Sequence, residues 1–361
     1  MNILQLFISG NIGGIERLSY EYGTHSSNNN IFVFLWEGGI IADKLESAGL
    51  TTIRLNLGKK DIFKSIGALK KLCRDYKIDA IVAQHEAPLL RIYSYLVSRS
   101  CHTRLYTYAH SNCEDICQVK KTKFLFLRKA IFRFTFNKSD RVIAISESVK
   151  KSLVDMLNIR ESHISVIYNG VNVDAFAPLE AKHDLTKMLY VGRLIWEKGV
   201  QNTLKALSIL PKDLSYSFSI VGKGPYEDEI RGLIDEYKLS DKVKLLGERN
   251  DVAELMSDAD IFLHAPEWEE GFGITVVEAM ASGCMCLCFK AGGISEIIDD
   301  GVDGYLVEKG NIREYSDKIK EIIEKIQTGG VDNIKTAAVT KSKSFSIDRY
   351  AKAIDALVSG R

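Results

Sequence analysis

The chain has 361 residues, a formal net charge of +1, and 46% hydrophobic and 26% charged residues. Its length is about twice that of a typical domain, so two domains are expected. The small net charge excludes a basic field for nucleic acid over the whole surface, although a local patch stays open. The composition is that of a globular protein rather than a disordered one.

The amino-terminal stretch and the cysteines predict a cytoplasmic protein. "MNILQLFISG" has no basic leader and no small-residue cleavage site, and no apolar run reaches the length of a membrane span. The seven cysteines are odd in number and lack the spacing of a disulfide framework. His110, Cys113 and Cys117 lack a fourth ligand and a second paired motif, so no metal site is expected.

Strand-like and helix-like segments alternate along the first half of the chain. Strands are expected at 2–9, 31–37, 51–57, 79–84, 104–110 and 141–146, with helices at 15–25, near 42–48 and at 62–76. Such alternation predicts a parallel sheet that is covered by helices on both faces.

The same pattern restarts after a polar break at 168–186. Strands are expected at 187–193, 217–224, 243–248, 260–266 and 284–289, with helical segments between them. We therefore predict an α/β chain of two doubly wound domains, 1–172 and 173–344. A last helix, within 345–361, is expected to pack back toward the amino-terminal domain.

The loops that follow strands are the candidate ligand sites, because open α/β sheets bind ligands beyond the carboxyl ends of their strands. "SGNIGGIERL" is a glycine-rich turn that opens a helix, and its free amides suit a phosphate, although a simple tight turn explains it equally well. "GRLIWEKG" carries Arg193 and Lys198, a rigid fork and a mobile cation that together suit a diphosphate. An exposed charge pair near Glu197 is the alternative.

The stretch "EWEEGFGITVVEAMASG" places acids beside glycines. Glu270 precedes an expected helix and Glu278 lies inside it among apolar neighbours. Carboxylates would repel a phosphate, but they accept hydrogen bonds from hydroxyls such as those of a ribose. Gly271 and Gly273 let the backbone approach a ligand and expose its amides. Phosphates, a ribose and further hydroxyls together describe a nucleotide-sugar, whereas Glu267 and Glu269 fit a solvated acidic loop.

This stretch resembles the E-x7-E signature of the retaining glycosyltransferases of family 4, with Glu270 and Glu278 as the two acids. "VGRLIWEKGV", "VGKGP", "LGERNDV", "YNGVNVDAF", "GGISEIIDDGVDGYLV" and "GGIERL" also look like loops of that family, in order, from residue 13 to about 307. The resemblance implies a GT-B fold, in which two Rossmann-like domains face each other across a cleft. The amino-terminal domain would serve the acceptor and the carboxyl-terminal domain the nucleotide-sugar donor.

The resemblance also implies roles for single residues. Arg193 and Lys198 would hold the diphosphate, with help from the backbone amide of Gly14. Glu278 would bind the ribose, and Glu270 would bind hydroxyls of the transferred sugar. The catalytic residues implied are Arg193, Lys198, Glu270 and His110, which would lie near the reacting centre. The donor-binding set implied is Gly14, Arg193, Lys198, Gly222, Arg249, Asn250, Glu270, Gly271, Phe272, Gly273 and Glu278, with Arg249 and Asn250 beside the base.

The expected reaction is retaining, metal-independent transfer of a sugar from a UDP-linked donor to a saccharide or lipid-linked saccharide acceptor. A role in bacterial surface polysaccharide, such as capsule, O-antigen or lipopolysaccharide, is implied, with no cofactor. Asp258-Ala259-Asp260 imitates a metal-binding D-x-D, but it precedes a buried strand and suits capping. Two alternatives stay open: a GT-B sugar-nucleotide epimerase, and a non-catalytic nucleotide-sugar-binding subunit of a glycosylation complex.

The stretch "QVKKTKFLFLRKAIFRFTFNK" at 118–138 has no acidic residue and interleaves five phenylalanines with cations. A basic, aromatic helix suits an anionic bilayer surface. A helix that packs on the sheet with its lysines in water is the alternative. The membrane-facing cations expected are Lys120, Lys121, Lys123, Arg128, Lys129 and Arg133. We therefore expect a cytoplasmic protein that can associate peripherally with the cytoplasmic face of the inner membrane.

Overall fold

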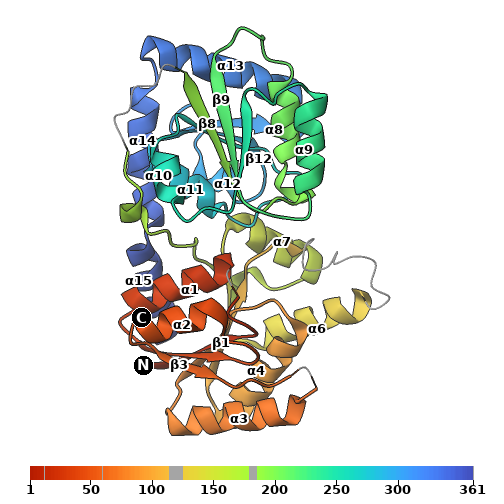
Figure 1. Ribbon diagram of the computed structural model, residues 1–361. Coiled ribbons are helices and arrows are strands. Elements are labelled where there is room, and N and C mark those ends of the chain that lie inside the picture. The colour runs from red at the N-terminus through yellow and green to blue at the C-terminus, as the bar shows by residue number, and fades with distance from the viewer. Residues whose placement is uncertain (12, 59, 114–124, 179–184, 361) are drawn as a thin grey trace. The chain divides into compact units, whose positions relative to one another are not determined.

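The structure is a computed structural model that describes residues 1–11, 13–58, 60–113, 125–178 and 185–360. Internal contacts divide the chain into two compact units, Met1–Gly170 with Ile347–Arg361, and Val171–Ser346. The sequence placed the corresponding boundaries at 172/173 and 344/345. Each unit is built on one parallel sheet with helices around it (Figure 1). The predicted fold class is therefore confirmed.

The first unit has a seven-stranded sheet in the order β3-β2-β1-β4-β5-β6-β7. Its strands are β1 (Asn2–Phe7), β2 (Asn29–Phe34), β3 (Thr51–Arg54), β4 (Ala80–Ala83), β5 (Arg104–Ala109), β6 (Arg141–Ala144) and β7 (Ile164–Val166). Its helices are α1 (Gly14–His25), α2 (Gly39–Ser47), α3 (Ile62–Asp75), α4 (Pro88–Cys101), α6 (Leu125–Lys138), α7 (Glu147–Leu157) and α15 (Ile347–Ser359).

Successive side chains of a strand point to opposite faces of the sheet, and here both faces are buried under helices. Leu6 of β1 belongs to a core with Leu69 of α3 and Leu90 of α4. Its neighbour Phe7 belongs to a second core with Leu45 of α2. Long apolar strands are what a doubly covered parallel sheet requires.

The last helix, α15, belongs to the first unit and is held there by polar contacts. The hydroxyls of Tyr350 and Tyr108 lie 2.6 Å apart and are buried. Asp355 accepts hydrogen bonds from the Tyr22 hydroxyl at 2.7 Å and the Ser26 hydroxyl at 2.8 Å. These contacts tie the end of the chain to α1 and β5.

The second unit has a six-stranded sheet in the order β10-β9-β8-β11-β12-β13. Its strands are β8 (Thr186–Val191), β9 (Tyr216–Val221), β10 (Val243–Gly247), β11 (Ile261–His264), β12 (Met285–Lys290) and β13 (Tyr305–Glu308). Its helices are α8 (Val200–Leu207), α9 (Glu227–Glu236), α10 (Val252–Ser257), α11 (Ile274–Ala281), α12 (Ile294–Ile297), α13 (Ile312–Thr328) and α14 (Asp332–Ser342). Figure 1 shows α8 and α9 on one side of the sheet and α10, α11 and α14 on the other.

The strand order reverses between β8 and β11, which pair directly with each other. The chain leaves these two strands in opposite directions, so the loops beyond their carboxyl ends diverge and leave room for a ligand. The fold therefore marks the segments after Val191 and after His264 as the first place to look for a site.

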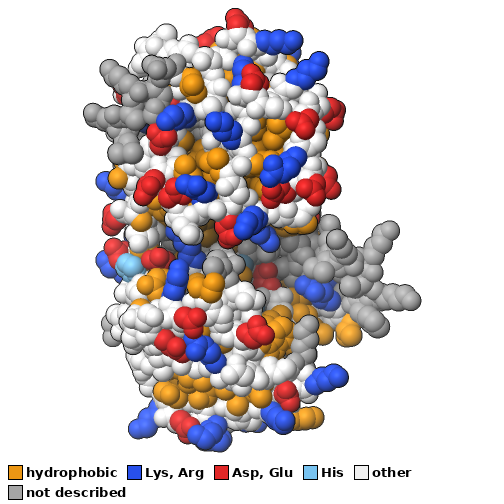
Figure 2. Space-filling model, in the orientation of Figure 1, with side chains coloured by type: hydrophobic (Ala, Val, Ile, Leu, Met, Phe, Trp, Pro, Cys, Tyr) orange, Lys and Arg blue, Asp and Glu red, His pale blue; other side chains and the backbone are white. Residues whose placement is uncertain are grey.

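Figure 2 shows lysine and arginine side chains interspersed with aspartate and glutamate over the visible face, as the net charge of +1 suggests. Within the part of the chain that the structure describes, no helix combines the length and apolar character needed to cross a bilayer.

Candidate active site

The loop after β8 carries two cations, Arg193 and Lys198, and the buried residue Leu194 between them holds the loop in place. Leu194 is fully buried, donates its amide to the Lys223 carbonyl at 2.9 Å, and accepts from the Tyr226 amide at 3.0 Å. Arg193 is exposed, and its guanidinium makes no ion pair with any residue that the structure describes. A short 3₁₀ turn, Trp196–Lys198, then turns Lys198 inward, where its side chain is only 17% exposed.

Gly199 brings this loop against the loop after β11. Its φ is +73°, and a Cβ there would lie 1.8 Å from the carbonyl oxygen of Ala265, so only glycine allows this approach. The Glu267 amide donates to the Glu197 carbonyl at 3.0 Å, and the Asn202 side chain donates to the Ala265 carbonyl at 2.9 Å. The two loops of the switch point are thus locked together.

Lys198 and Glu270 meet across this junction. The Lys198 ammonium donates to both Glu270 carboxylate oxygens, at 2.7 and 2.8 Å, and the Glu270 side chain is 15% exposed. His264, the last residue of β11, lies beneath them with its Nε2 atom 3.6 Å from one of these oxygens. The structure therefore brings together two of the predicted residues and a third that the sequence analysis missed.

The charges explain the ionisation of Glu270. Burial alone would raise the pKa of its carboxyl, but the Lys198 ammonium and the adjacent His264 ring outweigh burial and lower that pKa well below its usual range. Glu270 is therefore a carboxylate at neutral pH, and it neutralises Lys198. An anionic ligand that needs Lys198 must compete with Glu270 for it.

The neighbouring acid, Glu269, has a structural role. It accepts from the Gly292 amide at 2.5 Å and pairs with the Lys309 ammonium. The Gly293 amide donates to the Glu270 carbonyl at 2.8 Å. The glycine pair after β12 thus fixes the backbone that carries Glu270, and Glu269 is held away from it.

The helix that follows, α11, starts at the predicted glycine. Gly273 is its N-cap with a φ of +116°, and Phe272 is buried with its ring edge-on to Phe345, 5.5 Å between centroids. Gly271 and Gly273 therefore lie in the segment that leads into the helix amino terminus, where unpaired amides favour a polar ligand atom. Glu278 lies in α11 itself and is 2% exposed. Its ribose role stays a prediction.

The other predicted donor-binding residues of this unit lie on adjacent loops. Gly222 follows β9 with a φ of +140°, and a Cβ there would lie 1.8 Å from the Gly192 carbonyl oxygen. Arg249 and Asn250 follow β10 and are exposed, and Arg249 makes a bidentate ion pair with Asp251 at 2.8 and 2.5 Å. Any contact from Arg249 to a base therefore competes with Asp251.

His110 follows β5 in the first unit, and the carboxylate of Glu86 positions its backbone. The Glu86 carboxylate accepts from the backbone amides of His110 at 2.7 Å and Ser111 at 3.2 Å. The His110 ring stacks on Tyr108 at 4.8 Å, and its Nε2 atom is buried with no hydrogen-bond partner among the described residues. Burial, then the nearby His85 and Arg91, lower the pKa of His110 to about 3, so the ring is neutral at physiological pH.

Gly14 opens α1, and an acid lies beside it. One carboxylate oxygen of Glu16 lies within hydrogen-bond distance of His85 Nε2, at 2.8 Å. The other carboxylate oxygen lies so close to Gly13 that a Cβ at that position would be 2.5 Å from it. The Ile8 amide donates to His85 Nδ1 at 3.0 Å, which leaves the proton of a neutral ring on Nε2, facing Glu16. The glycine loop of the first unit therefore carries a fixed carboxylate next to its helix amino terminus.

The predicted membrane residues are only partly described, because Lys120, Lys121 and Lys123 lie outside the described residues. On α6, Phe126, Leu127 and Phe134 are 87%, 55% and 47% exposed. Arg128 and Lys129 are half-buried and Arg133 is exposed. Phe132 and Phe136 are fully buried instead, with the Arg91 guanidinium over their rings at 5.2 and 4.0 Å. The aromatic pattern of this stretch thus has two causes, core packing and an exposed face.

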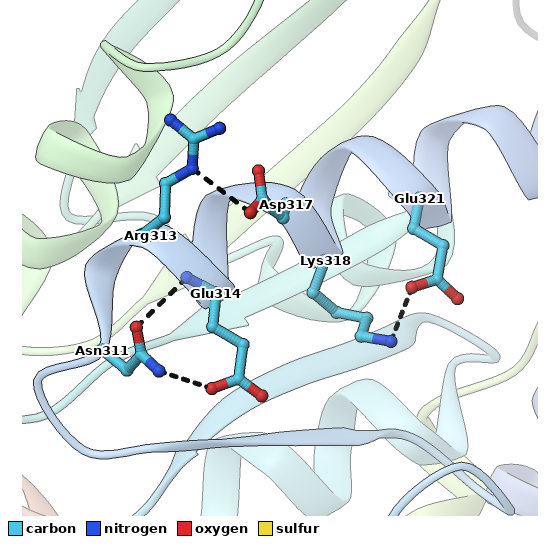
Figure 3. A pocket seen from close by; sticks show the side chains of 6 residues that line it. All are labelled: Asn311, Arg313, Glu314, Asp317, Lys318 and Glu321. Carbon is cyan, nitrogen blue, oxygen red and sulfur yellow. Dashed lines mark hydrogen bonds and ion pairs between the residues drawn. The ribbon is translucent and has the colours of Figure 1, made fainter.

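Two other features carry no site. No group of His, Cys, Asp or Glu side chains in the described ranges is arranged to hold a metal ion. The groove on α13 in Figure 3 is lined by side chains that pair with one another, such as Arg313 with Asp317 and Lys318 with Glu321. Asn311 caps the helix there by accepting from the Glu314 amide at 3.3 Å.

Comparisons with known proteins identify the family. Residues 174–329 match the family model described as glycosyl transferases group 1, and residues 12–175 match Glycosyltransferase Family 4. An uncharacterised glycosyltransferase of Methanocaldococcus jannaschii is 34% identical over 194 residues, 53% of this chain. The chain spans 52% of that relative, about half its length.

Two further comparisons extend over most of the chain. An Escherichia coli UDP-Gal:alpha-D-GlcNAc-diphosphoundecaprenol alpha-1,3-galactosyltransferase is 25% identical over 342 residues, 87% of this chain and 85% of that one. The crystal structure of Anabaena HepE in complex with UDP superimposes with a TM-score of 0.87 at 22% identity, covering 100% of both chains. The likeness to HepE shows the two-domain GT-B fold, and the two family models, which together span residues 12–329, show that the chain belongs to the group 1 and family 4 glycosyltransferases.

Proposed function

We propose that the protein transfers a sugar from a UDP-linked donor to a lipid-linked saccharide, with retention of configuration and without a metal ion. The observation that carries this proposal is the pairing of Lys198 with Glu270 at the switch point of the second sheet, with exposed Arg193 on the same loop. Two cations beside one carboxylate suit a ligand that is anionic at one end and hydroxylated at the other.

The chemistry of transfer fits these groups. As the bond between the sugar and the diphosphate breaks, negative charge grows on the leaving diphosphate and positive charge on the sugar ring. Arg193 and Lys198 would stabilise the leaving group, and the amino end of α11 would add its amides. Glu270 would accept hydrogen bonds from the sugar hydroxyls. The acceptor would attack on the face that the diphosphate leaves, which retains the configuration.

Metal independence is supported by the way the D-x-D-like acids are used. Asp258 binds the Lys187 ammonium at 2.9 and 2.8 Å, and Asp260 accepts from the Lys187 amide at 2.9 Å. Both acids precede β11 and so lie at the amino edge of the sheet, whereas the Lys198–Glu270 pair lies beyond its carboxyl edge. Arg193 and Lys198 would take the charge-neutralising role that a metal has in other transferases.

The donor and acceptor classes are supported by the relatives. The Escherichia coli relative is named for UDP-Gal and for a diphosphoundecaprenol-linked acceptor, and HepE is solved with UDP. We therefore propose a UDP-sugar donor, an undecaprenyl-type acceptor, and a role in building a bacterial surface polysaccharide.

A lipid-linked acceptor requires the enzyme to reach a membrane. We define the α6 patch as the exposed apolar residues Phe126, Leu127 and Phe134 with the cations Arg128, Lys129 and Arg133. Exposed apolar side chains flanked by cations suit the interface of an anionic bilayer. The α6 patch would hold the enzyme at the cytoplasmic surface where such acceptors lie.

The test begins with a thermal-shift panel of nucleotide-sugars, followed by transfer to a synthetic lipid-diphosphate-linked sugar in the presence of EDTA. Stabilisation by a UDP-sugar and transfer with an α-linked product from an α-linked donor are expected. Binding without transfer to any acceptor would favour the non-catalytic subunit. Conversion of the donor to its epimer without an acceptor would favour the epimerase, and loss of transfer in EDTA would contradict metal independence.

A further inference from the structure

Lys198, Glu270 and His264 form a cluster, and the family resemblance assigns no role to His264. A role for His264 in binding the donor rests on the proposed function. The residue ends β11 and is 2% exposed. Its ring lies between Tyr190 and Phe262, at centroid distances of 5.9 and 6.3 Å. This packing fixes the direction in which the ring points.

Glu270 lies closer to Lys198 than to His264. The two Lys198 contacts are 2.7 and 2.8 Å, whereas His264 Nε2 lies 3.6 Å from the nearer Glu270 oxygen. A distance of 3.6 Å is too long for a hydrogen bond. If the Glu270 carboxylate moved about 1 Å toward His264, the two groups would form a hydrogen bond, since charge-assisted hydrogen bonds are near 2.8 Å.

Binding of the sugar donor creates the need for that shift. The diphosphate carries an ionised oxygen on each phosphorus, and the proposed function pairs it with Lys198. When the ammonium turns to the diphosphate, Glu270 remains a carboxylate that is 15% exposed and has lost its counter-ion. An unpaired carboxylate in such a place is costly unless another group donates to it.

The chemistry of the His264 ring suits it to that role. Its Nδ1 atom is buried and has no hydrogen-bond partner among the described residues. The Nε2 atom faces Glu270, so an N–H at this position can donate to the carboxylate.

We propose that His264 is a positioning residue that takes over Glu270 when Lys198 turns to the diphosphate of the sugar donor. Lys198 then neutralises the leaving group, and His264 keeps the carboxylate oriented toward the sugar hydroxyls. Lys198 and His264 are thus two alternative partners for the Glu270 carboxylate.

The test is a double-mutant cycle on the affinity for UDP, measured by calorimetry with inorganic pyrophosphate as a second probe. His264→Phe keeps a ring between Tyr190 and Phe262 but removes the donor, and should weaken UDP binding about tenfold or more. Glu270→Gln removes the negative charge that competes with the diphosphate for Lys198, and no unpaired carboxylate is left when UDP binds. This variant should therefore bind UDP more tightly than wild type. In the Glu270→Gln background, His264→Phe should change the affinity less than about twofold, because there is no charge left to hold.

Two controls separate positioning from general damage. His264→Gln offers an N–H near the position of Nε2 and should restore most of the affinity lost in His264→Phe. In the wild type, UDP should shift the imidazole Nε2–H proton signal of His264 downfield, a measurement that needs no folded variant.

The outcomes distinguish this inference from the proposed function. Equal weakening by His264→Phe in both backgrounds, or an unmoved imidazole signal on UDP binding, would overturn the role of His264 and leave the donor site intact. A wild-type protein that binds neither UDP nor pyrophosphate would overturn both.

Discussion

Lys198 donates to both carboxylate oxygens of Glu270, and the two residues come from loops that leave β8 and β11 on either side of the switch point. The pair is inward, with side chains 17% and 15% exposed, so it is more than a surface ion pair. Glu270 thus neutralises the cation that the proposed function assigns to the leaving diphosphate. Each partner therefore affects both stability and function.

Lys198→Ala should nearly abolish transfer. Loss of one cation from a leaving-group site costs about 10²–10³-fold in turnover, and loss of a charge-assisted contact should weaken UDP binding about tenfold or more. Steady-state transfer and calorimetry measure the two effects. Lys205→Ala, which removes an exposed lysine from α8, should keep both values within about twofold of wild type. Normal turnover in Lys198→Ala would refute the site.

Glu270 should make the protein sensitive to acid. Its pKa is lowered in the folded state despite burial, because Lys198 and His264 favour the charged form. A lowered acid pKa contributes stability above its unfolded value, near 4.3, and this contribution is lost as the pH falls below that value. Wild type should therefore lose up to about 1.4 kcal/mol per pH unit more than Glu270→Gln below about pH 4. Urea unfolding at pH 3 to 6 measures the difference, and parallel curves would contradict it.

The sequence identified Lys198 and Glu270 as site residues but did not predict that they pair with each other. Arg193, Lys198, Glu270 and Glu278 were identified from motifs, and the α/β alternation predicted both sheets. The contact itself depends on Gly199, whose close approach to Ala265 is a tertiary fact that spacing in the sequence does not contain. The same holds for Gly292 and Gly293, which fix the backbone of Glu270 from a third loop.

His264 was missed for a physical reason. In "DIFLHAP" it ends an apolar strand, and a histidine there is compatible with simple burial. A polar residue at the carboxyl end of the strand beside the switch point was the available signal.

The phenylalanines of 118–138 were interpreted together as one membrane-facing pattern. In the structure, Phe132 and Phe136 pack on Arg91, and only part of the pattern faces outward. One helix can serve the core and the surface at once, and the sequence pattern alone did not separate them.

His110 should lower stability in mild acid. Its pKa is about 3 in the folded protein, mainly because of burial, whereas an unfolded histidine titrates near 6.5. Between these values the unfolded state binds more protons, so stability rises with pH through the window and is lost on acidification. His110→Gln should flatten this slope by up to about 1.4 kcal/mol per pH unit. Urea unfolding from pH 4 to 7 tests it, and an NMR titration with a His110 midpoint near 6.5 would contradict it.

The α6 patch should determine binding to anionic vesicles. Phe126→Glu with Leu127→Glu adds repulsive charge to side chains that are 87% and 55% exposed, so the fold should be unaffected. Flotation with phosphatidylglycerol vesicles should show wild type bound and the double variant lost from the vesicle fraction. Phe63→Glu, at an 89% exposed position on α3, is the matched control and should float like wild type. Equal flotation of wild type with and without vesicles would argue against membrane association.

Gly199→Ala should damage the site without touching a charged group. The position has a φ of +73°, where an L side chain costs about 1–2 kcal/mol, and its Cβ would lie 1.8 Å from the Ala265 carbonyl oxygen. Because that atom is backbone, the loops after β8 and β11 must separate, which moves Lys198 away from Glu270. We expect a lower melting temperature together with weaker UDP binding. Gly232→Ala in α9, where a Cβ meets nothing within 4 Å, should be neutral or stabilise by about 0.5–1 kcal/mol. If Gly199→Ala lost stability but bound UDP normally, the glycine would serve the fold alone, and the placement of Lys198 would have to depend on the 3₁₀ turn instead.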